Sequence, residues 1–331
     1  MKGWVDNEVN PQDIIINSSV SLLRNFSDVK FTNKLSEFEA KENINKVSSA
    51  LDNNFKLICL WEENKNDIEN YLNEDIISKK LSKRDNIGAV LYNDSFNTSI
   101  MINEEDHLNI KCTLAGLNLK EEYRYVNRID DIIENKITYA FHERFGYITV
   151  SPDNIGTGLK ASVVIHLPAL NYTKKIEDLS KSLCRDGFII ESIYDDKKII
   201  SNMFRLSTKI SIGLHEEDII DKFDMSIFKI INDEKQMRVD LFTKYKSEIE
   251  DRIFRSYAIL KNAIMISEKE VIELLSDVRL GIEMSLINED KKKINQILIR
   301  TSRKFINNDG YELSVRDQNI ERAKMIKEIL G

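Results

Sequence analysis

The sequence predicts an α+β fold in which an antiparallel sheet is flanked by helices. Short β-rich runs bounded by Gly, Asn and Asp fill the middle of the chain, and long amphipathic segments interrupt them. After Gly213 the chain contains no proline and only three glycines, while apolar residues recur at helical spacing. These patterns place a sheet before residue 215 and a helical region after it.

The first 80 residues are predicted to form a small, mostly helical lobe. A short strand-like run, 13–17, opens it, and the stretch LSEFEAKENINKVSSAL then places apolar residues on roughly one face of a helix. These residues are Leu35, Phe38, Ile44, Val47 and Leu51. The spacing therefore predicts an amphipathic helix within the domain 1–80.

Residues 81–215 are predicted to form the sheet domain. Its strand-like runs are NIGAVLYN, NTSIMIN, HLNIKCTL, GYITVS, KASVVIHL, FIIESIY and MFRLSTKISIG. Two amphipathic helices interrupt these strands, one from Leu119 to about Arg144 and one from about Leu170 to Cys184. Residues 216–331 are predicted to form a helical region that serves dimerisation or partner binding.

Length, charge and cysteine content exclude several classes of protein. With 331 residues, the chain is long enough for about two domains. Its net charge of -7 argues against a protein that binds nucleic acid by neutralising phosphates. Cys59, Cys112 and Cys184 are far apart, so the pattern indicates neither a disulfide framework nor a metal site. No apolar run is long enough to span a membrane and no signal peptide is present, which predicts a cytoplasmic protein.

Four longer stretches resemble one known family, in the family's order along the chain. They are NEEDHL (103–108), SPDNIGTGLKASVVIHLPAL (151–170), EDRIFRSYAIL (250–260) and LSDVRLGIE (275–283). From about residue 13 to residue 330, the chain resembles the bacterial protein-arginine kinase family, McsB, a relative of the phosphagen kinases. The resemblance implies a phosphagen-kinase-like fold and an ATP:guanido phosphotransferase reaction, in which Mg-ATP donates its γ-phosphoryl group to protein arginine.

The resemblance implies catalytic carboxylates at Glu105 and Asp196, which would orient or deprotonate the arginine guanidinium. Glu105 lies in NEEDHL, a run of charge that by itself would be more typical of a solvated strand end. Asp196 stands where the family has glutamate. His107 is expected to be a hydrogen-bonded structural residue with no chemical role.

Phosphoryl transfer depends on cations placed around the phosphate oxygens, and arginine suits this task because its fork makes bidentate contacts. The resemblance implies five such arginines. This chain has Ser19, Ser21, Asn109, Lys160 and Glu191 at those positions. The lysine and the glutamate cancel, so the formal charge of the five positions falls from +5 to 0. The sequence therefore predicts that Mg-ATP does not bind in the way that the family resemblance implies.

A second site implied by the family, which recognises phosphoarginine, is altered as well. Its Arg-Asp-x-x-Arg-Ala motif aligns with QNIERA, where Gln318 and Asn319 replace the first pair and Arg322 is kept. Phosphoarginine binding is therefore predicted to be weakened. The two other C-terminal motifs contain charged residues that are predicted to form buried ion pairs, namely Arg252, Arg255, Asp277 and Arg279.

These losses favour a degenerate protein-arginine kinase, a pseudokinase with weak or no catalysis and a regulatory or scaffolding role. By analogy with the family, its partners would be an McsA-type activator, a CtsR-type repressor and a Clp unfoldase in the stress response. A homodimer is the expected assembly. Neither a membrane nor nucleic acid is expected as a direct partner.

Two alternatives stay open. The chain is an active kinase if an activator or substitute cations complete the site, and the candidate cations are Arg24, Arg205 and Lys209 beside Lys160. This alternative requires Arg205 and Lys209 to face the cleft. The chain is an arginine-peptide binding module if its acidic residues hold a guanidinium without phosphoryl transfer. Those residues are Glu104, Glu105, Glu191 and Asp196.

Overall fold

The computed structural model describes residues 4–6, 14–51, 54–95, 97–194, 200–209, 213–301 and 313–331. The chain forms two compact units. Unit 1 comprises Met1–Trp4, Asn17–Val163 and Ser207–Asp224, and unit 2 comprises Val5–Ile16, Val164–Leu206 and Met225–Gly331. Unit 1 contains most of the predicted N-terminal lobe together with much of the predicted sheet domain. The three-part division by sequence, at residues 80 and 215, stays a prediction.

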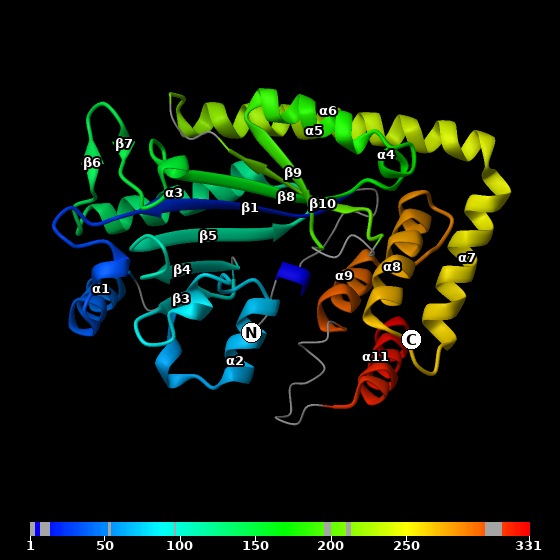
Figure 1. The fold of residues 1–331 in the computed structure, drawn as a ribbon, viewed down its shortest axis with the longest axis horizontal. Helices are drawn as coiled ribbons and strands as arrows, with labels where there is room; N and C mark the ends of the chain where they lie inside the picture. The colour runs from blue at the N-terminus through cyan, green and yellow to red at the C-terminus, as the bar shows by residue number, and fades with distance from the viewer. Residues whose placement is uncertain are drawn as a thin grey trace. The chain divides into compact units, whose positions relative to one another are not determined.

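Eight strands form one sheet in the order β2-β3-β4-β5-β1-β8-β10-β9 (Figure 1). The pairs β1–β5, β2–β3, β3–β4 and β4–β5 are antiparallel, as predicted. The strands of the sheet are β1 (Ile15–Arg24), β2 (Lys56–Cys59), β3 (Ala89–Asn93), β4 (Thr98–Ile102), β5 (Leu108–Ala115), β8 (Leu159–His166), β9 (Phe188–Ser192) and β10 (Met203–Thr208). A separate hairpin consists of β6 (Phe141–His142) and β7 (Gly146–Tyr147).

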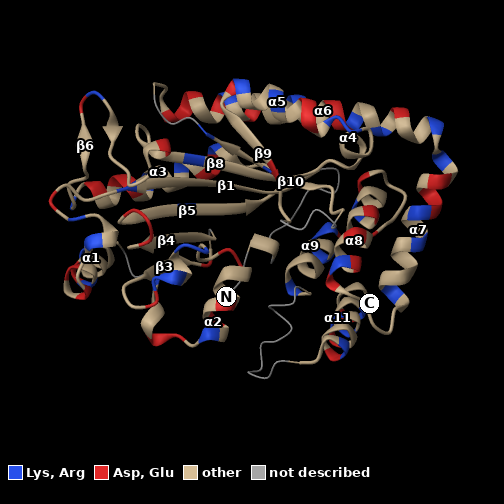
Figure 2. Cartoon of the chain, in the orientation of Figure 1, with Lys and Arg blue, Asp and Glu red and all other residues tan. Residues whose placement is uncertain are grey.

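Helices accompany the sheet in both units, which confirms the predicted α+β class. Those of unit 1 are α1 (Glu37–Ala50), α2 (Lys65–Asn73) and α3 (Leu119–Glu134). Those of unit 2 are α4 (Pro168–Tyr172), α5 (Ile176–Asp186), α7 (Lys246–Asn262), α8 (Glu268–Glu283), α9 (Lys291–Arg300) and α11 (Val315–Leu330), while α6 (Glu216–Lys244) belongs to both. Both signs of charge are interspersed along α6 and α7 (Figure 2). In the described part of the chain, no helix has the length and apolarity that a membrane span requires.

The core of unit 1 forms where α3 packs against β5. The helix buries an apolar stripe made by Val126, Ile129 and Ile133, and the strands contribute Val20 and Ile110, which are inaccessible to solvent. Burial of each such side chain contributes about 1.5 to 3 kcal/mol relative to exposure. The amphipathic period of α3 therefore determines which face of the sheet it covers.

The helix predicted within the first 80 residues is α1. It begins at Ser36, whose side chain and backbone exchange hydrogen bonds with Glu39 in a capping box. Ile44 and Val47 are buried, as the spacing predicts. Phe38, however, is 73% exposed, so the prediction that it faces the core is wrong. It lies in the first turn of the helix, where the buried stripe has only begun.

The helical part of unit 2 packs around one apolar core, to which α7, α8, α9 and α11 contribute. Gly281 lies on α8 where this helix meets α7. A Cβ atom at this position would lie 2.5 Å from the Ile253 side chain, so glycine permits the close approach of the two helices. The last third of the chain is helical wherever the structure describes it, as predicted.

Two predicted helices end or break earlier than expected. The helix predicted to reach about Arg144 ends at Glu134, and its place is taken by the β6–β7 hairpin, whose turn leads into Gly146 at φ +79°. The helix predicted from Leu170 to Cys184 is divided into α4 and α5 at Lys174, where φ is +58°. Only the second break places a residue, Lys174, in the left-handed region, which helical periodicity alone does not reveal; the first helix is capped by Asn135, which has right-handed backbone angles.

Glu122 of α3 is a buried acid that faces the sheet. Its Oε1 accepts hydrogen bonds from the Ser18 hydroxyl at 2.8 Å and from the backbone N–H of Leu114 at 3.0 Å. Its Oε2 is buried without a hydrogen-bond partner. Burial raises the pKa of this carboxyl group to about 8, so the neutral acid is the form that packs against the sheet at pH 7.

We expect Glu122→Gln to remove part of the pH dependence of stability. Between pH 4.5 and 8 the folded state keeps a proton that the unfolded state has released, so raising the pH lowers the free energy of unfolding. The slope from this group is at most about 1.4 kcal/mol per pH unit. Urea unfolding at pH 5 and pH 8 should show similar stabilities at pH 5 and a more stable variant at pH 8. A constant difference between the two proteins would contradict the assignment.

Candidate functional site

Successive side chains of strand β1 point to opposite sides of the sheet, so its two faces contact different parts of the protein. Ser18 donates a hydrogen bond to Glu122, and Arg24 donates one to Asp130, both of which belong to α3. The even-numbered residues of β1 therefore face α3. Ser19 and Ser21 consequently project from the opposite face of the sheet, which we call the open face.

Four of the five positions predicted for nucleotide phosphates lie on this open face. In the β1–β5 register, Ser21 is opposite Lys111 and Leu23 is opposite Asn109, and directly opposite residues share a face. The Ser19 hydroxyl lies 2.9 Å from the hydroxyl of Ser162, two residues after Lys160 on β8. Unit 1 therefore brings Ser19, Ser21, Asn109 and Lys160 to one face of the sheet, while their predicted role toward nucleotide stays a prediction.

The positive charge on the open face is sparse. Lys160 is exposed, and no described residue forms a hydrogen bond or ion pair with its side chain. Lys111 forms an ion pair with Asp75. The side-chain amide of Asn109 donates to Glu104 at 3.2 Å. Among the described residues at the four positions, only Lys160 therefore offers a cation to a ligand.

The NEEDHL segment is a tight connection between β4 and β5. Asn103 adopts φ +60°, and its side-chain amide donates to the carbonyls of Ala40 and Ile87, both at 3.0 Å. Nδ1 of His107 accepts from the N–H of Phe26 at 3.0 Å, so its Nε2 is the group that donates to the carbonyl of Lys30 at 2.8 Å. Burial lowers the pKa of His107, in keeping with this neutral form. His107 thus has the hydrogen-bonded, structural environment that was predicted.

The three acids of NEEDHL have different environments. Glu104 is 4% exposed and accepts hydrogen bonds from Ser78 and Asn109. Asp106 is buried, which raises the pKa of its carboxyl group, and it accepts from the N–H of Val150 at 2.7 Å. Glu105 is 30% exposed and forms an ion pair with Lys80, which is itself exposed. Among these acids, Glu105 is therefore the one that a solvent-borne guanidinium could reach.

Arg24, a predicted substitute cation, is buried on the α3 side of β1. Its guanidinium donates twice to Asp130, at 2.7 and 3.0 Å, and once to the carbonyl of Thr157 at 2.8 Å. It also lies 3.6 Å from the ring centroid of Tyr147. These contacts engage the guanidinium within unit 1, on the face opposite Lys160.

The glycine-containing loop between residues 154 and 159 packs against the same arginine. Gly158 adopts φ +64°, and a Cβ atom there would lie 2.5 Å from the carbonyl oxygen of Leu23 and 2.8 Å from Nη1 of Arg24. The backbone N–H of Leu23 donates to the carbonyl of Gly158 at 2.9 Å. These close contacts and the positive φ angle explain why glycine is needed at position 158, without reference to a bound phosphate.

Three further predicted residues lie on or just after β9 and β10, the last two strands in the sheet order. Glu191 is exposed on β9 of unit 2. Arg205 of β10 is exposed and alternates with the buried Leu206, and Lys209 is exposed just after that strand. The Thr208 hydroxyl accepts from the N–H of Ala161, one residue from Lys160. Asp196, the second predicted catalytic carboxylate, lies outside the described residues.

The predicted phosphoarginine residues lie on α11. Arg322 is 2% exposed, and it donates to the carbonyls of Thr301 at 2.8 Å and Ile266 at 3.0 Å and to Oδ1 of Asn319 at 2.7 Å. The Gln318 side-chain amide donates to the carbonyl of Leu313. Arg322 thus joins the ends of two other segments of unit 2 through its guanidinium.

Sequence reasoning missed three residues that define the site. Ser162 bonds to Ser19, Lys80 pairs with Glu105, and Asp130 holds Arg24. Each partner is 25 or more residues away in the sequence. A strand-parity argument would have placed Arg24 opposite Ser19 and Ser21, but the other contacts have no local signal. Within the described ranges, no group of three His, Cys, Asp or Glu side chains is placed to hold a metal ion.

We expect Arg24→Gln to destabilise unit 1 by about 3 to 5 kcal/mol, because it leaves the Asp130 carboxylate buried without its cation. Urea unfolding at pH 7 measures this loss. The control is Arg128→Gln, an exposed position on the same helix as Asp130, which should change stability by about 0.5 kcal/mol or less. Equal stability of the two variants would mean that the Arg24–Asp130 pair does not hold α3 to the sheet.

Two family models match nearly the whole chain. "ATP:guanido phosphotransferase, C-terminal catalytic domain" matches residues 38–237, and "Protein-arginine kinase McsB C-terminal domain" matches residues 246–331. The protein-arginine kinase of Clostridium botulinum is 42% identical, and the match covers 100% of this chain and 99% of that protein. The protein-arginine kinase of Bacillus subtilis is 33% identical, and the match covers 100% of this chain and 93% of that protein.

Solved structures share the fold at lower identity. Lombricine kinase is 19% identical with a TM-score of 0.60, and the match covers 72% of this chain and 70% of that one. The substrate-free duplicated taurocyamine kinase from Schistosoma mansoni is 20% identical with a TM-score of 0.60, and the match covers 72% of this chain but only 37% of the duplicated one. From its full-length identity to the bacterial relatives and its match to both models, the chain belongs to the protein-arginine kinase family, McsB.

Proposed function

We propose that this chain is a degenerate protein-arginine kinase that keeps the fold and acts mainly through protein contacts, with weak or no phosphoryl transfer. The observation that carries the proposal is the set of residues at the five positions where the resemblance implies phosphate-binding arginines, four of which lie on the open face. At the family's five phosphate positions the chain has Ser19, Ser21, Asn109, Lys160 and Glu191, of which one is a cation. Phosphoryl transfer relies on several preorganised cations, so this face is poorly suited to it.

The residues present do not fit the triphosphate of Mg-ATP in the family's manner. Each charge-assisted hydrogen bond is worth roughly 1.5 to 3 kcal/mol. With four of five arginine contacts replaced by residues that are not cations, nucleotide affinity falls by several orders of magnitude, even after a large allowance for non-additivity. The Ser19 hydroxyl and the Asn109 amide nitrogen also have hydrogen-bond partners within the protein, Ser162 and Glu104, so neither of these groups needs a phosphate as its partner.

The regulatory role would be exerted in the cytoplasm, as part of the stress response. Its partners would be proteins of the McsA, CtsR and Clp unfoldase types, and the chain would form a homodimer. These assignments rest on analogy with the family. A chain that retains the fold but binds nucleotide weakly can still compete with an active relative for such partners.

An active kinase is the second candidate, and one feature of the open face favours it. Lys160 has no partner among the described residues, and Arg205 and Lys209 are exposed. Glu105 is partly exposed, and its present partner is a solvent-exposed lysine that a substrate guanidinium could displace.

The first experiment is calorimetric titration of the purified full chain with Mg-ADP and Mg-ATP. We expect no heat of binding at millimolar nucleotide, because the open face offers one cation where the family has several. A relative with arginine at all five positions is the positive control, and circular dichroism checks that the fold is intact. Micromolar affinity would overturn the degenerate-site proposal.

A phosphorylation assay then separates the two candidates. If any transfer to an arginine-containing protein is detected, Glu105→Gln should abolish it, because this change removes the carboxylate that would orient the guanidinium. Lys160→Gln should reduce nucleotide binding at least tenfold for an active kinase. The matched control is Lys136→Gln, an exposed lysine of unit 1 whose side chain bonds to the carbonyl of Ala50. No transfer by the wild type, with or without an activator, leaves the degenerate kinase as the function.

A further inference from the structure

Unit 2 contains a cavity of about 710 Å³ among α4, α6, α7 and α8. Much of its wall is apolar and includes Ala169, Leu241, Ile253 and Leu280. This volume and a mainly apolar lining with a few polar groups are typical of sites that bind a small molecule or the end of a peptide. Neither kinase candidate makes use of this cavity.

Two of the four stretches that carry the family resemblance meet at its wall. EDRIFRSYAIL contributes Arg252, and LSDVRLGIE contributes Asp277. Nε of Arg252 lies 2.9 Å from the Asp277 carboxylate, which also accepts a hydrogen bond of 2.9 Å from the Ser256 hydroxyl. The side chain of Asp277 is 12% exposed and that of Arg252 is 58% exposed. Asp277 therefore anchors an arginine whose outer part reaches solvent.

The anchored arginine keeps two amino groups for a ligand. Its bond to Asp277 uses Nε, and neither Nη1 nor Nη2 donates to any described residue. A guanidinium is planar, so fixing Nε also fixes the direction of the remaining N–H groups. The pair thus presents a preoriented donor edge, which is the arrangement that binds the two oxygens of a carboxylate or phosphate.

The second arginine of the cavity wall is not available in this way. Arg238 is 7% exposed, and its three nitrogens donate to Glu234 at 2.7 Å, to Glu283 at 2.7 Å and to the carbonyl of His166 at 3.2 Å. Among the described residues that line the cavity, Arg252 is therefore the cation that can meet a ligand.

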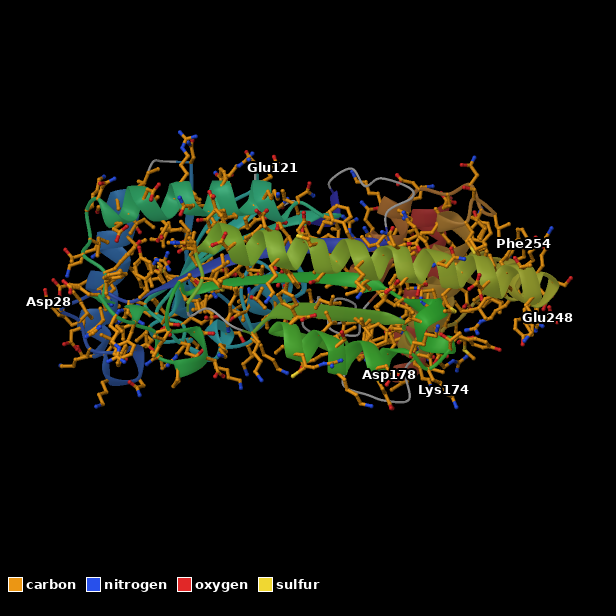
Figure 3. The ribbon with its side chains drawn as sticks, turned by 90° about the horizontal axis from the view of Figure 1, so that it is seen from above. Asp28, Glu121, Lys174, Asp178, Glu248 and Phe254 are labelled. Atoms are coloured by element: carbon orange, nitrogen blue, oxygen red, sulfur yellow. The ribbon has the colours of Figure 1, made fainter. Side chains whose placement is uncertain are left out.

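Glu248, one turn before Arg252 on α7, also lines the cavity, and it is exposed. Figure 3 labels Glu248 and Phe254, which leave α7 in different directions, and only the former borders the cavity. An exposed carboxylate contributes little to binding energy, because water solvates it well. It nevertheless disfavours ligands with several anionic groups, such as a di- or triphosphate, so a ligand with a single oxyanion group fits best.

We propose that this cavity is a binding site for a ligand with one oxyanion group, a carboxylate or a phosphate monoester, on an apolar body. The oxyanion pairs with the amino groups of Arg252, while Ile253 and Leu280 contact the body. The proposal is independent of whether the open face of unit 1 binds nucleotide.

The test is NMR and calorimetric titration of the full chain with three probes. N-acetyl-phenylalanine offers a carboxylate, phenyl phosphate offers a phosphate, and N-acetyl-phenylalanine amide is the uncharged control. We expect near-millimolar binding of at least one charged probe, and at least tenfold weaker binding of the amide. A tighter complex with phenyl phosphate identifies a phosphate monoester as the ligand group, and the reverse order identifies a carboxylate.

Arg252→Gln should weaken binding of the charged probe at least tenfold and leave that of the amide unchanged. The matched control is Arg255→Gln, which lies one turn further on α7, is exposed and pairs with Asp251 outside the cavity. If Arg252→Gln fails to fold, shifts of the Ile253 and Leu280 methyl signals in the wild type locate the probe instead. Absence of binding by both charged probes, shifts elsewhere, or equal effects of the two substitutions would overturn the proposal.

Discussion

The alternation of side chains along β1 is the constraint on which unit 1 depends. Even-numbered residues bind α3 through Ser18–Glu122 and Arg24–Asp130, and these contacts leave Ser19 and Ser21 on the open face. A shift of the register by one residue would exchange the two faces. It would place Arg24 on the open face and bury two serines against α3. The buried Arg24–Asp130 pair opposes such a shift, because a separated pair would leave a charge buried without a partner.

Several polar and charged side chains on the open face of unit 1 have partners within the protein that do not depend on a bound anion. Five arginines close together would repel one another, and a family site of that kind is balanced by the phosphates it binds. Here Ser19 bonds to Ser162, Asn109 bonds to Glu104, and Lys111 pairs with Asp75. The residues present at these positions thus avoid that repulsion. The fold of unit 1 therefore does not require nucleotide binding, which is a condition that a degenerate kinase has to meet.

The sequence predicted structure correctly where a local pattern determines it. It failed to predict structure that depends on contacts between residues far apart in the chain. Six of the seven β-rich runs contain strands of the sheet, whereas GYITVS forms only the two-residue β7 of the separate hairpin. Ile44 and Val47 turn inward on α1, and Arg279 forms the predicted buried ion pair, with Glu283 at 2.8 Å. Arg252 and Arg255, by contrast, are exposed, so their predicted burial is wrong, although both form ion pairs. The break of the helix at Lys174 depends on a left-handed residue, which is a rare conformation for lysine. The partners of Arg24 and Glu105 depend on tertiary contacts that no local spacing encodes.

Four of the described arginines have two kinds of environment, and the difference bears on where a ligand binds. Arg24, Arg238 and Arg322 are at most 7% exposed, and each donates to two or more acceptors of the protein. Such arginines join segments of the chain, and their removal should be read first as a loss of stability. Arg252 differs because one carboxylate anchors its Nε and its amino groups remain for a partner. An anchored cation with free donors has little benefit for folding, since partly exposed ion pairs contribute about 0 to 1 kcal/mol. Its geometry is better explained by recognition, so the helical unit has the features of a binding site of its own, apart from the kinase chemistry of the family.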